Sequence, residues 1–168
     1  DNFSMGTLPQ AFQDKYDVWL AYWNTGPSGT SSIAENARCL QDQVHEVFTG
    51  TGGNQKITLV AHSTGGVISR ACLSNSQCAS EVKSLYTLGS PHAGINVLTL
   101  SFLTMLSTGN LGNLNSLCLS QDGACQLETL AMITFNSFNW NRAGIRYTFI
   151  GGDAAVPWGI ALAMSTGR

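Results

Sequence analysis

The chain has 168 residues and a mass of 17.9 kDa, enough for one domain with a substantial core and too few for two of ordinary size. With 43% hydrophobic and only 11% charged residues, the composition is that of a globular protein and excludes intrinsic disorder. The formal net charge of -2, without any basic run, argues against binding to nucleic acid. We therefore expect a single globular domain over residues 1–168.

In chain order, the predicted elements alternate between strands and helices, which favours a parallel sheet covered by helices. The helix after the first strand has Ser31 or Ser32 as its N-cap. The run ITLVAH is short and apolar throughout, as in strands that are buried on both faces of a sheet. The predicted elements are a buried strand at Asp17–Trp23, an amphipathic helix at Ser31–Thr49, a strand at Ile57–His62, a helix at Gly65–Ser74, a strand at Lys83–Leu88, a helix at Cys125–Trp140 and a strand at Ile145–Ile150.

The five cysteines bear on the compartment of the protein. Cys72 and Cys78 are close in sequence, as are Cys118 and Cys125, and each pair predicts a local disulfide worth about 2 kcal/mol in an oxidising compartment. Separately buried, reduced thiols are the alternative. Cys39 is left over, either as a buried thiol or with a partner outside this chain. No CxxC pair occurs, so the sequence offers no zinc ribbon.

The two ends of the chain carry no obvious targeting signal. The longest apolar run, Val156–Met164, is much shorter than a membrane span. The chain opens with DNFS rather than with Met and a signal sequence, which is typical of a mature or trimmed polypeptide.

The strongest motif follows the predicted strand ITLVAH, which leads directly into Ser63 and then into a helix. Strand, sharp turn and helix form the context of a nucleophile elbow, in which a strained serine presents its hydroxyl above the sheet. The turn needs small residues two positions before and after the serine, and Ala61 and Gly65 meet this need. The N–H of Thr64, at the start of the helix, would stabilise an oxyanion.

At these residues the chain resembles the α/β-hydrolase superfamily, and within it the secreted bacterial lipases and related carboxylesterases. Two segments carry the resemblance: LVAHSTGGVISR around Ser63, and LYTLGSPHAG at Leu85–Gly94. The resemblance implies an α/β-hydrolase fold, a mostly parallel sheet with helices on both faces. It also implies that Ser63 is the nucleophile and Thr64 one of two oxyanion donors, with no metal or organic cofactor. Ala61 stands where Gly is commoner in the family.

The three histidines are expected in different roles. We expect His62 to point into the protein and His92 to brace the loops beside the nucleophile, and we place both next to the substrate together with Leu98 and Phe102. A role for His92 as catalytic base is the alternative. His45 lies on a predicted helix among acidic residues and is expected on the surface.

The acid of a catalytic triad should follow a late strand in the order Ser, Asp or Glu, His. Asp153 follows the predicted strand IRYTFI closely and begins a D-x-x-V-P pattern similar to that of many family members. Some lipases place the acid later, in an Asn-Asp-Gly segment that would fall beyond Arg168. No His follows Asp153, and no strand ending in His-Gly precedes Asp1. We therefore expect the first strands, the C-terminal end and the catalytic His in a longer chain or in a second chain.

No charged side chain occurs between Ser84 and Gln121. This stretch is either a buried helix followed by a loop, or an apolar lid-like segment, about residues 95–125, that covers a site for greasy ligands and meets a lipid interface transiently. The expected function is a secreted lipase or carboxylesterase that cleaves lipid or other acyl esters through an acyl-enzyme on Ser63. The alternatives are an acyltransferase with the same site and an inactive binding protein of the same fold.

Overall fold

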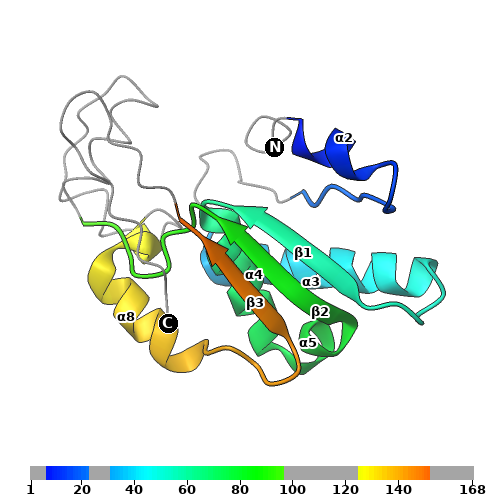
Figure 1. The fold of residues 1–168 in the computed structure, drawn as a ribbon. Coiled ribbons are helices and arrows are strands. Elements are labelled where there is room, and N and C mark those ends of the chain that lie inside the picture. Colours follow the sequence, from blue (N-terminus) through cyan, green and yellow to red (C-terminus); the bar gives the residue numbers. More distant parts are fainter. Residues whose placement is uncertain (1–6, 23–30, 97–124, 152–168) are drawn as a thin grey trace.

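The computed structural model describes residues 7–22, 31–96 and 125–151 (Figure 1). Their centre is a parallel sheet of three strands in the order β1-β2-β3. The strands are β1 at Ile57–His62, β2 at Val82–Leu88 and β3 at Arg146–Ile150. His62 pairs with Leu88, and Leu88 with Ile150. The carboxyl ends of all three strands therefore lie side by side at one edge of the sheet, where open α/β sheets bind their ligands.

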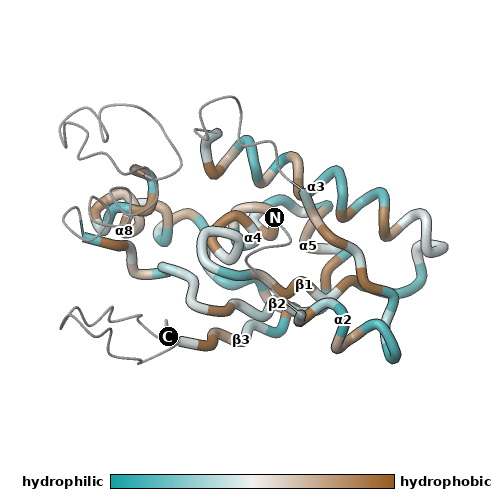
Figure 2. Tube along the Cα trace, turned by 90° about the horizontal axis from the view of Figure 1, so that it is seen from above, coloured by the Kyte–Doolittle hydropathy of each residue, from teal (hydrophilic) through white to brown (hydrophobic). Residues whose placement is uncertain are grey.

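Most of the described helices form one layer against the sheet. Figure 2 shows α3, α4, α5 and α8 on the same side of the strands, and only the short α2 lies away from this layer. The described residues therefore show one helical layer of the predicted fold. The helices are α2 at Leu8–Phe12, α3 at Ile33–Gly50, α4 at Thr64–Ser74, α5 at Ser76–Glu81 and α8 at Thr129–Phe138.

The start of α3 confirms the predicted N-cap and selects Ser32. The Glu35 N–H donates to Ser32 Oγ over 3.1 Å, and the Ser32 N–H donates to the Glu35 carboxylate over 2.8 Å. This reciprocal capping box satisfies two N–H groups that the helix itself leaves without partners. The Glu35 carboxylate accepts from the Ser32 N–H and, over 2.9 Å, from the Ser32 hydroxyl, and these two hydrogen bonds lower the pKa of Glu35. The apolar stripe of α3 is buried against α4 and α5, in agreement with the amphipathic helix that the sequence predicted.

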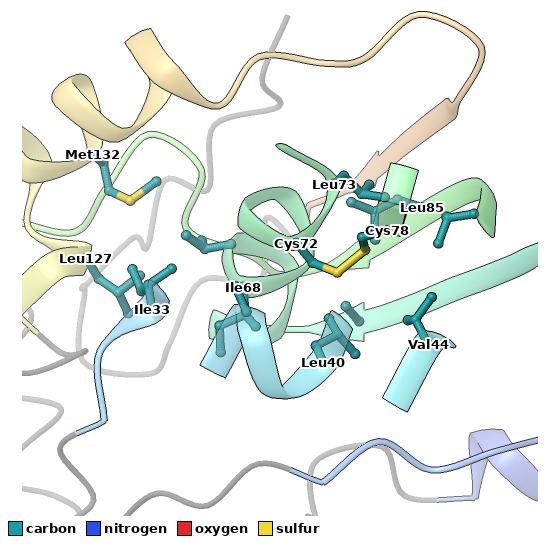
Figure 3. Packing of buried hydrophobic residues seen from close by; sticks show 14 residues of the cluster. Ile33, Leu40, Val44, Ile68, Cys72, Leu73, Cys78, Leu85, Leu127 and Met132 are labelled. Carbon is teal, nitrogen blue, oxygen red and sulfur yellow. A yellow bond between two sulfur atoms is a disulfide. The ribbon is translucent and has the colours of Figure 1, made fainter. Parts of the chain in front are cut away.

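The core lies between the sheet and this helical layer (Figure 3). The Cys72–Cys78 disulfide is part of the core and links α4 to α5, which confirms the predicted pairing. Cys118 lies outside the described residues. The largest buried side chains of the core are Val67, Ile68, Leu73, Val82, Leu85 and Met132.

The prediction of a buried strand at Asp17–Trp23 is wrong for the residues that the structure describes. Residues 17–22 form no strand, and the side chains of Trp19 and Tyr22 are largely exposed. The backbone of Tyr22 is hydrogen-bonded to the side chain of Gln43 on α3 instead of to a neighbouring strand. A strand needs such a neighbour to pair its N–H and C=O groups, and residue type alone does not supply one.

The prediction that β1 is buried on both faces also fails. Ala61 is buried against the helices, whereas Thr58, Val60 and His62 are exposed. Successive side chains of a strand point to opposite faces, and the helical layer of the described residues covers only one of them. The apolar residues of ITLVAH therefore do not share one environment.

Two helices differ from their predicted form. The predicted helix Cys125–Trp140 begins as a 3-10 turn at Cys125–Leu127, and α8 itself starts at Thr129. Glu128 is the N-cap of α8, because its carboxylate accepts the Leu130 N–H over 2.8 Å. The helix α5 was not predicted. It starts after Asn75, whose side chain accepts the Gln77 N–H over 2.8 Å.

Candidate active site

Ser63 occupies the turn between β1 and α4 with the strained backbone that the motif predicted. Its φ is 53° and its ψ is -131°, and no other non-glycine residue of the described chain has a positive φ. Such a conformation is costly for a residue with a Cβ and is found mainly at functional sites. The Ser63 N–H donates to Leu88 O of β2 over 2.9 Å. The Ser63 side chain is exposed and makes no capping hydrogen bond to α4.

Small residues allow the sharp turn at Ser63. Gly66 is needed in addition because it packs closely against the end of β2, a contact that the motif did not predict. Ala61 and Gly65, the small residues that the turn needs, are both buried. Gly66 lies so close to the end of β2 that a Cβ at this position would be 2.2 Å from Ser90 Oγ and 2.9 Å from Thr87 Cγ2. The only sequence signal for this contact is the second glycine of STGG.

Thr64 is the first residue of α4. The first N–H groups of a helix have no partner within the helix and carry partial positive charge. The Thr64 N–H therefore carries partial positive charge next to Ser63.

His92 is buried in the segment after β2 and contacts side chains from three other parts of the fold. Its Nε2 lies 3.0 Å from Thr87 Oγ1, its Nδ1 lies 3.4 Å from Arg70 Nη1, and its ring meets the Phe149 ring edge to face. Burial, and secondly the nearby Arg70 charge, lower the pKa of His92 to about 4. The ring is thus neutral at neutral pH, with both nitrogens engaged by residues other than Ser63.

Of the other two histidines, only His62 differs from expectation. His62 is exposed instead of pointing into the protein, because it faces the side of β1 opposite to Ala61. His45 is exposed, as expected. Its Nδ1 lies 2.7 Å from Oε1 of the buried Glu81 side chain, and this contact links α3 to α5. Within the described chain, no histidine is hydrogen-bonded to Ser63.

The remaining predicted site residues, Asp153, Leu98 and Phe102, lie outside the described residues. Ile95, at the start of the predicted lid-like segment, is hydrogen-bonded to Leu127, just beyond its end: the Ile95 N–H donates to Leu127 O over 2.8 Å. Likewise, Ile95 and Glu128 form an isolated parallel bridge.

Two other kinds of functional feature are absent from the described ranges. They contain no group of His, Cys, Asp and Glu side chains arranged to hold a metal ion. None of their helices combines the length and the apolar character that crossing a bilayer requires. A cavity of about 350 Å³ lies between α3, α4 and α8, lined among others by Arg38, Ala71 and Phe135. None of the predicted site residues that the structure describes lines it.

Three solved structures are similar to this chain. The mature lipase BlEst2 of Bacillus licheniformis is 24% identical with a TM-score of 0.60, and the match covers 80% of this chain and 54% of the lipase. Phospholipase PlaB of Legionella pneumophila is 18% identical with a TM-score of 0.67, over 95% of this chain and 38% of PlaB. The metagenomic carboxyl esterase MGS0156 is 19% identical with a TM-score of 0.51, over 76% of this chain and 38% of the esterase.

These similarities show the fold, which is that of the α/β-hydrolases, as the sequence predicted. The chain spans about half the length of BlEst2 and less of the other two proteins. No curated protein matches the sequence. The PGAP1-like alpha/beta domain matches residues 28–138, most of the chain, and the chain therefore belongs to this family.

Proposed function

We propose that the protein is a serine ester hydrolase in which Ser63 is the nucleophile. The observation that carries the proposal is the strained backbone of Ser63, at a φ of 53° between the end of β1 and the start of α4. A strained, exposed serine hydroxyl at the carboxyl edge of a parallel sheet is the arrangement by which α/β-hydrolases present their nucleophile. The lipase, phospholipase and esterase among the similar structures support the same reaction class.

In the proposed reaction, Ser63 Oγ attacks the carbonyl carbon of an ester while a general base removes its proton. The carbonyl oxygen becomes an oxyanion, which the Thr64 N–H and the N-terminus of α4 stabilise. The tetrahedral intermediate collapses, the protonated base returns its proton to the leaving alcohol, and an acyl-enzyme remains. A water molecule, activated by the same base, then attacks the acyl-enzyme and releases the acid.

The base in this scheme is a histidine from a part of the protein beyond these 168 residues or from a second chain. His92 is unsuited because it is buried and bonded to Thr87 and Arg70, and His45 is bonded to Glu81. The similar structures are longer than this chain, which leaves room for the base and for the second oxyanion donor. Asp153 is proposed as the acid that orients the imidazole, because β3 ends shortly before it and in register with the end of β2.

The proposed substrates are lipids or other acyl esters, and the proposed location is extracellular. The Cys72–Cys78 disulfide supports an oxidising compartment. Leu98, Phe102 and His62 remain proposed contacts of the substrate, whereas the buried His92 is proposed only to support the site.

Ser63→Ala in the full-length protein is the direct test, with Ser80→Ala, an exposed serine of α5, as the matched control. Ester turnover should fall by several orders of magnitude in the first variant because the covalent route is lost, and should not change in the second. A fluorophosphonate should label Ser63 in the wild type and leave the Ser63→Ala variant unlabelled. More than a tenth of wild-type turnover in Ser63→Ala would refute the assignment. Transfer of the acyl group to an added alcohol in preference to water would instead indicate an acyltransferase.

A further inference from the structure

Arg70 on α4 is held by an unusual set of partners. Its Nη1 donates to Asn136 Oδ1 over 2.7 Å and lies 3.4 Å from His92 Nδ1, while its Nη2 donates to the Asn139 carbonyl oxygen over 2.6 Å. The guanidinium carbon lies 5.4 Å from the centre of the Phe135 ring. All of these partners are uncharged, and no carboxylate in the described chain pairs with Arg70.

This arrangement costs free energy, and burial lowers the pKa of Arg70 accordingly. The Nε atom is buried without a hydrogen-bond partner. Arg70 is partly buried, and removing a cation from water without an anion beside it costs free energy, so charge pairing does not account for the position of Arg70. The hydrogen bonds of Arg70 give a better explanation for its position, because they join three elements that are distant in sequence: α4, α8 and the segment after β2.

The position of Arg70 relates these contacts to Ser63. Arg70 lies one turn beyond Gly66 on α4, so the two residues share a face of the helix. Gly66 touches Ser90 at close range, and Arg70 reaches His92. The same face of α4 is therefore pressed against the segment after β2 at two successive turns.

The end of β2, from which that segment continues, is hydrogen-bonded to the turn at Ser63. Leu88 O accepts the Ser63 N–H over 2.9 Å. His92 folds back onto Thr87, and Asn136 of α8 donates to His92 O over 2.8 Å while accepting from Arg70. Arg70, His92 and Asn136 thus form a closed triangle, which we call the brace. The brace fixes α4, whose first residue is the oxyanion donor Thr64, relative to the backbone that positions Ser63.

We propose that Arg70 is a positioning residue for ester hydrolysis: through the brace it sets the place of Ser63 Oγ relative to the Thr64 N–H. The proposal rests on the proposed function of Ser63. Without Arg70 the protein still folds, but the nucleophile and its oxyanion donor no longer hold the geometry that the reaction needs. Misplacement by about 1 Å costs up to about a hundredfold in rate.

The test compares variants of the full-length protein by the rate of fluorophosphonate labelling and by kcat and KM on a soluble short-chain ester. Arg70→Ala should slow labelling about 10- to 100-fold and lower kcat in parallel, with KM within about twofold of wild type. Arg70→Lys, which keeps the charge but cannot bind two acceptors in a fork, should recover only part of the rate.

Two control variants separate positioning from general damage. Arg38→Ala removes an exposed arginine of α3, and Val44→Ala opens a cavity in the core on the same helix, far from the brace in sequence. Both should be labelled at the wild-type rate, although Val44→Ala lowers the free energy of unfolding by about 1 to 3 kcal/mol. If Arg70 has only a structural role, Arg70→Ala should be labelled about as fast as Val44→Ala. Labelling rates of the two variants that agree within about twofold would therefore overturn the proposal.

If Arg70→Ala does not fold, as judged by circular dichroism, Asn136→Ala decides the question. It leaves Arg70 in place and removes two sides of the brace, so labelling should again slow about tenfold. An unchanged rate in that variant would overturn the proposal. A wild type that is not labelled at all refutes the proposed function itself and this proposal with it. If the wild type is labelled and Arg70→Ala is labelled at the same rate, only the role of Arg70 is refuted.

Discussion

We predict that His92 makes the fold less stable in acid. An unfolded histidine has a pKa near 6.5, whereas burial and the Arg70 charge lower the pKa of His92 to about 4 in the folded protein. Between these two values the unfolded chain binds a proton that the folded protein does not. The free energy of unfolding must therefore fall as the pH decreases from about 6.5 towards 4. Below pH 4 the stability that depends on a neutral His92 is lost completely.

The size of the effect follows from the two pKa values. At about 1.4 kcal/mol per pH unit, lowering the pKa from 6.5 to about 4 corresponds to up to about 3 kcal/mol. At pH 4.5 the folded ring is still mostly neutral, so about 2.5 kcal/mol of this loss should already be present, compared with pH 8. That is a large part of the stability of an ordinary domain.

Urea unfolding at pH 8 and pH 4.5 measures this contribution. His92→Gln keeps a neutral polar group that can bond to Thr87 but does not titrate, so its free energy of unfolding should lose about 2.5 kcal/mol less than that of the wild type over this range. His62→Gln, which removes an exposed histidine, is the matched control and should behave as the wild type does. If His92→Gln and wild type lose the same free energy within about 0.5 kcal/mol, the ring is not held neutral by its surroundings.

Three further predictions concern other parts of the molecule. Gly66→Ala should lower the free energy of unfolding by about 1 to 3 kcal/mol and reduce ester turnover, because the added Cβ would collide with Ser90; wild-type stability in urea would contradict this close contact. Replacing Cys72 and Cys78 together by Ala should cost about 2 kcal/mol of unfolding free energy, since the short disulfide loop no longer restricts the unfolded chain; equal midpoints for variant and wild type would show that the bridge is absent in solution, and peptide mapping without reduction checks the pairing directly. Leu103→Asp, in the predicted lid-like segment, should reduce hydrolysis of emulsified long-chain esters far more than that of soluble short-chain esters; equal losses on both substrates would favour a plain core helix.

The local sequence determined the elements that carry the chemistry. ITLVAH followed by small residues and a helical pattern predicted β1, the turn at Ser63 and α4, and the structure has all three. Such a turn depends on residues within a few positions of the serine, so its pattern is complete in the sequence. The same holds for the capping box at Ser32 and for the disulfide that closes a short loop.

Tertiary structure decided whatever depends on distant neighbours. The apolar and aromatic residues of 17–22 suit a strand, but pairing requires another strand beside them, and in the structure the Tyr22 backbone bonds to Gln43 instead. Whether His62 points inwards depends on which face of β1 the helices cover, and strand alternation does not specify this. The brace at Arg70 joins residues 66 positions apart in sequence, Arg70 and Asn136. Arg70 ends the segment LVAHSTGGVISR, but that segment does not predict its contact with Asn136. Long-range hydrogen bonds between polar side chains have no sequence period, and only the packing of α8 beside α4 brings the two residues into contact.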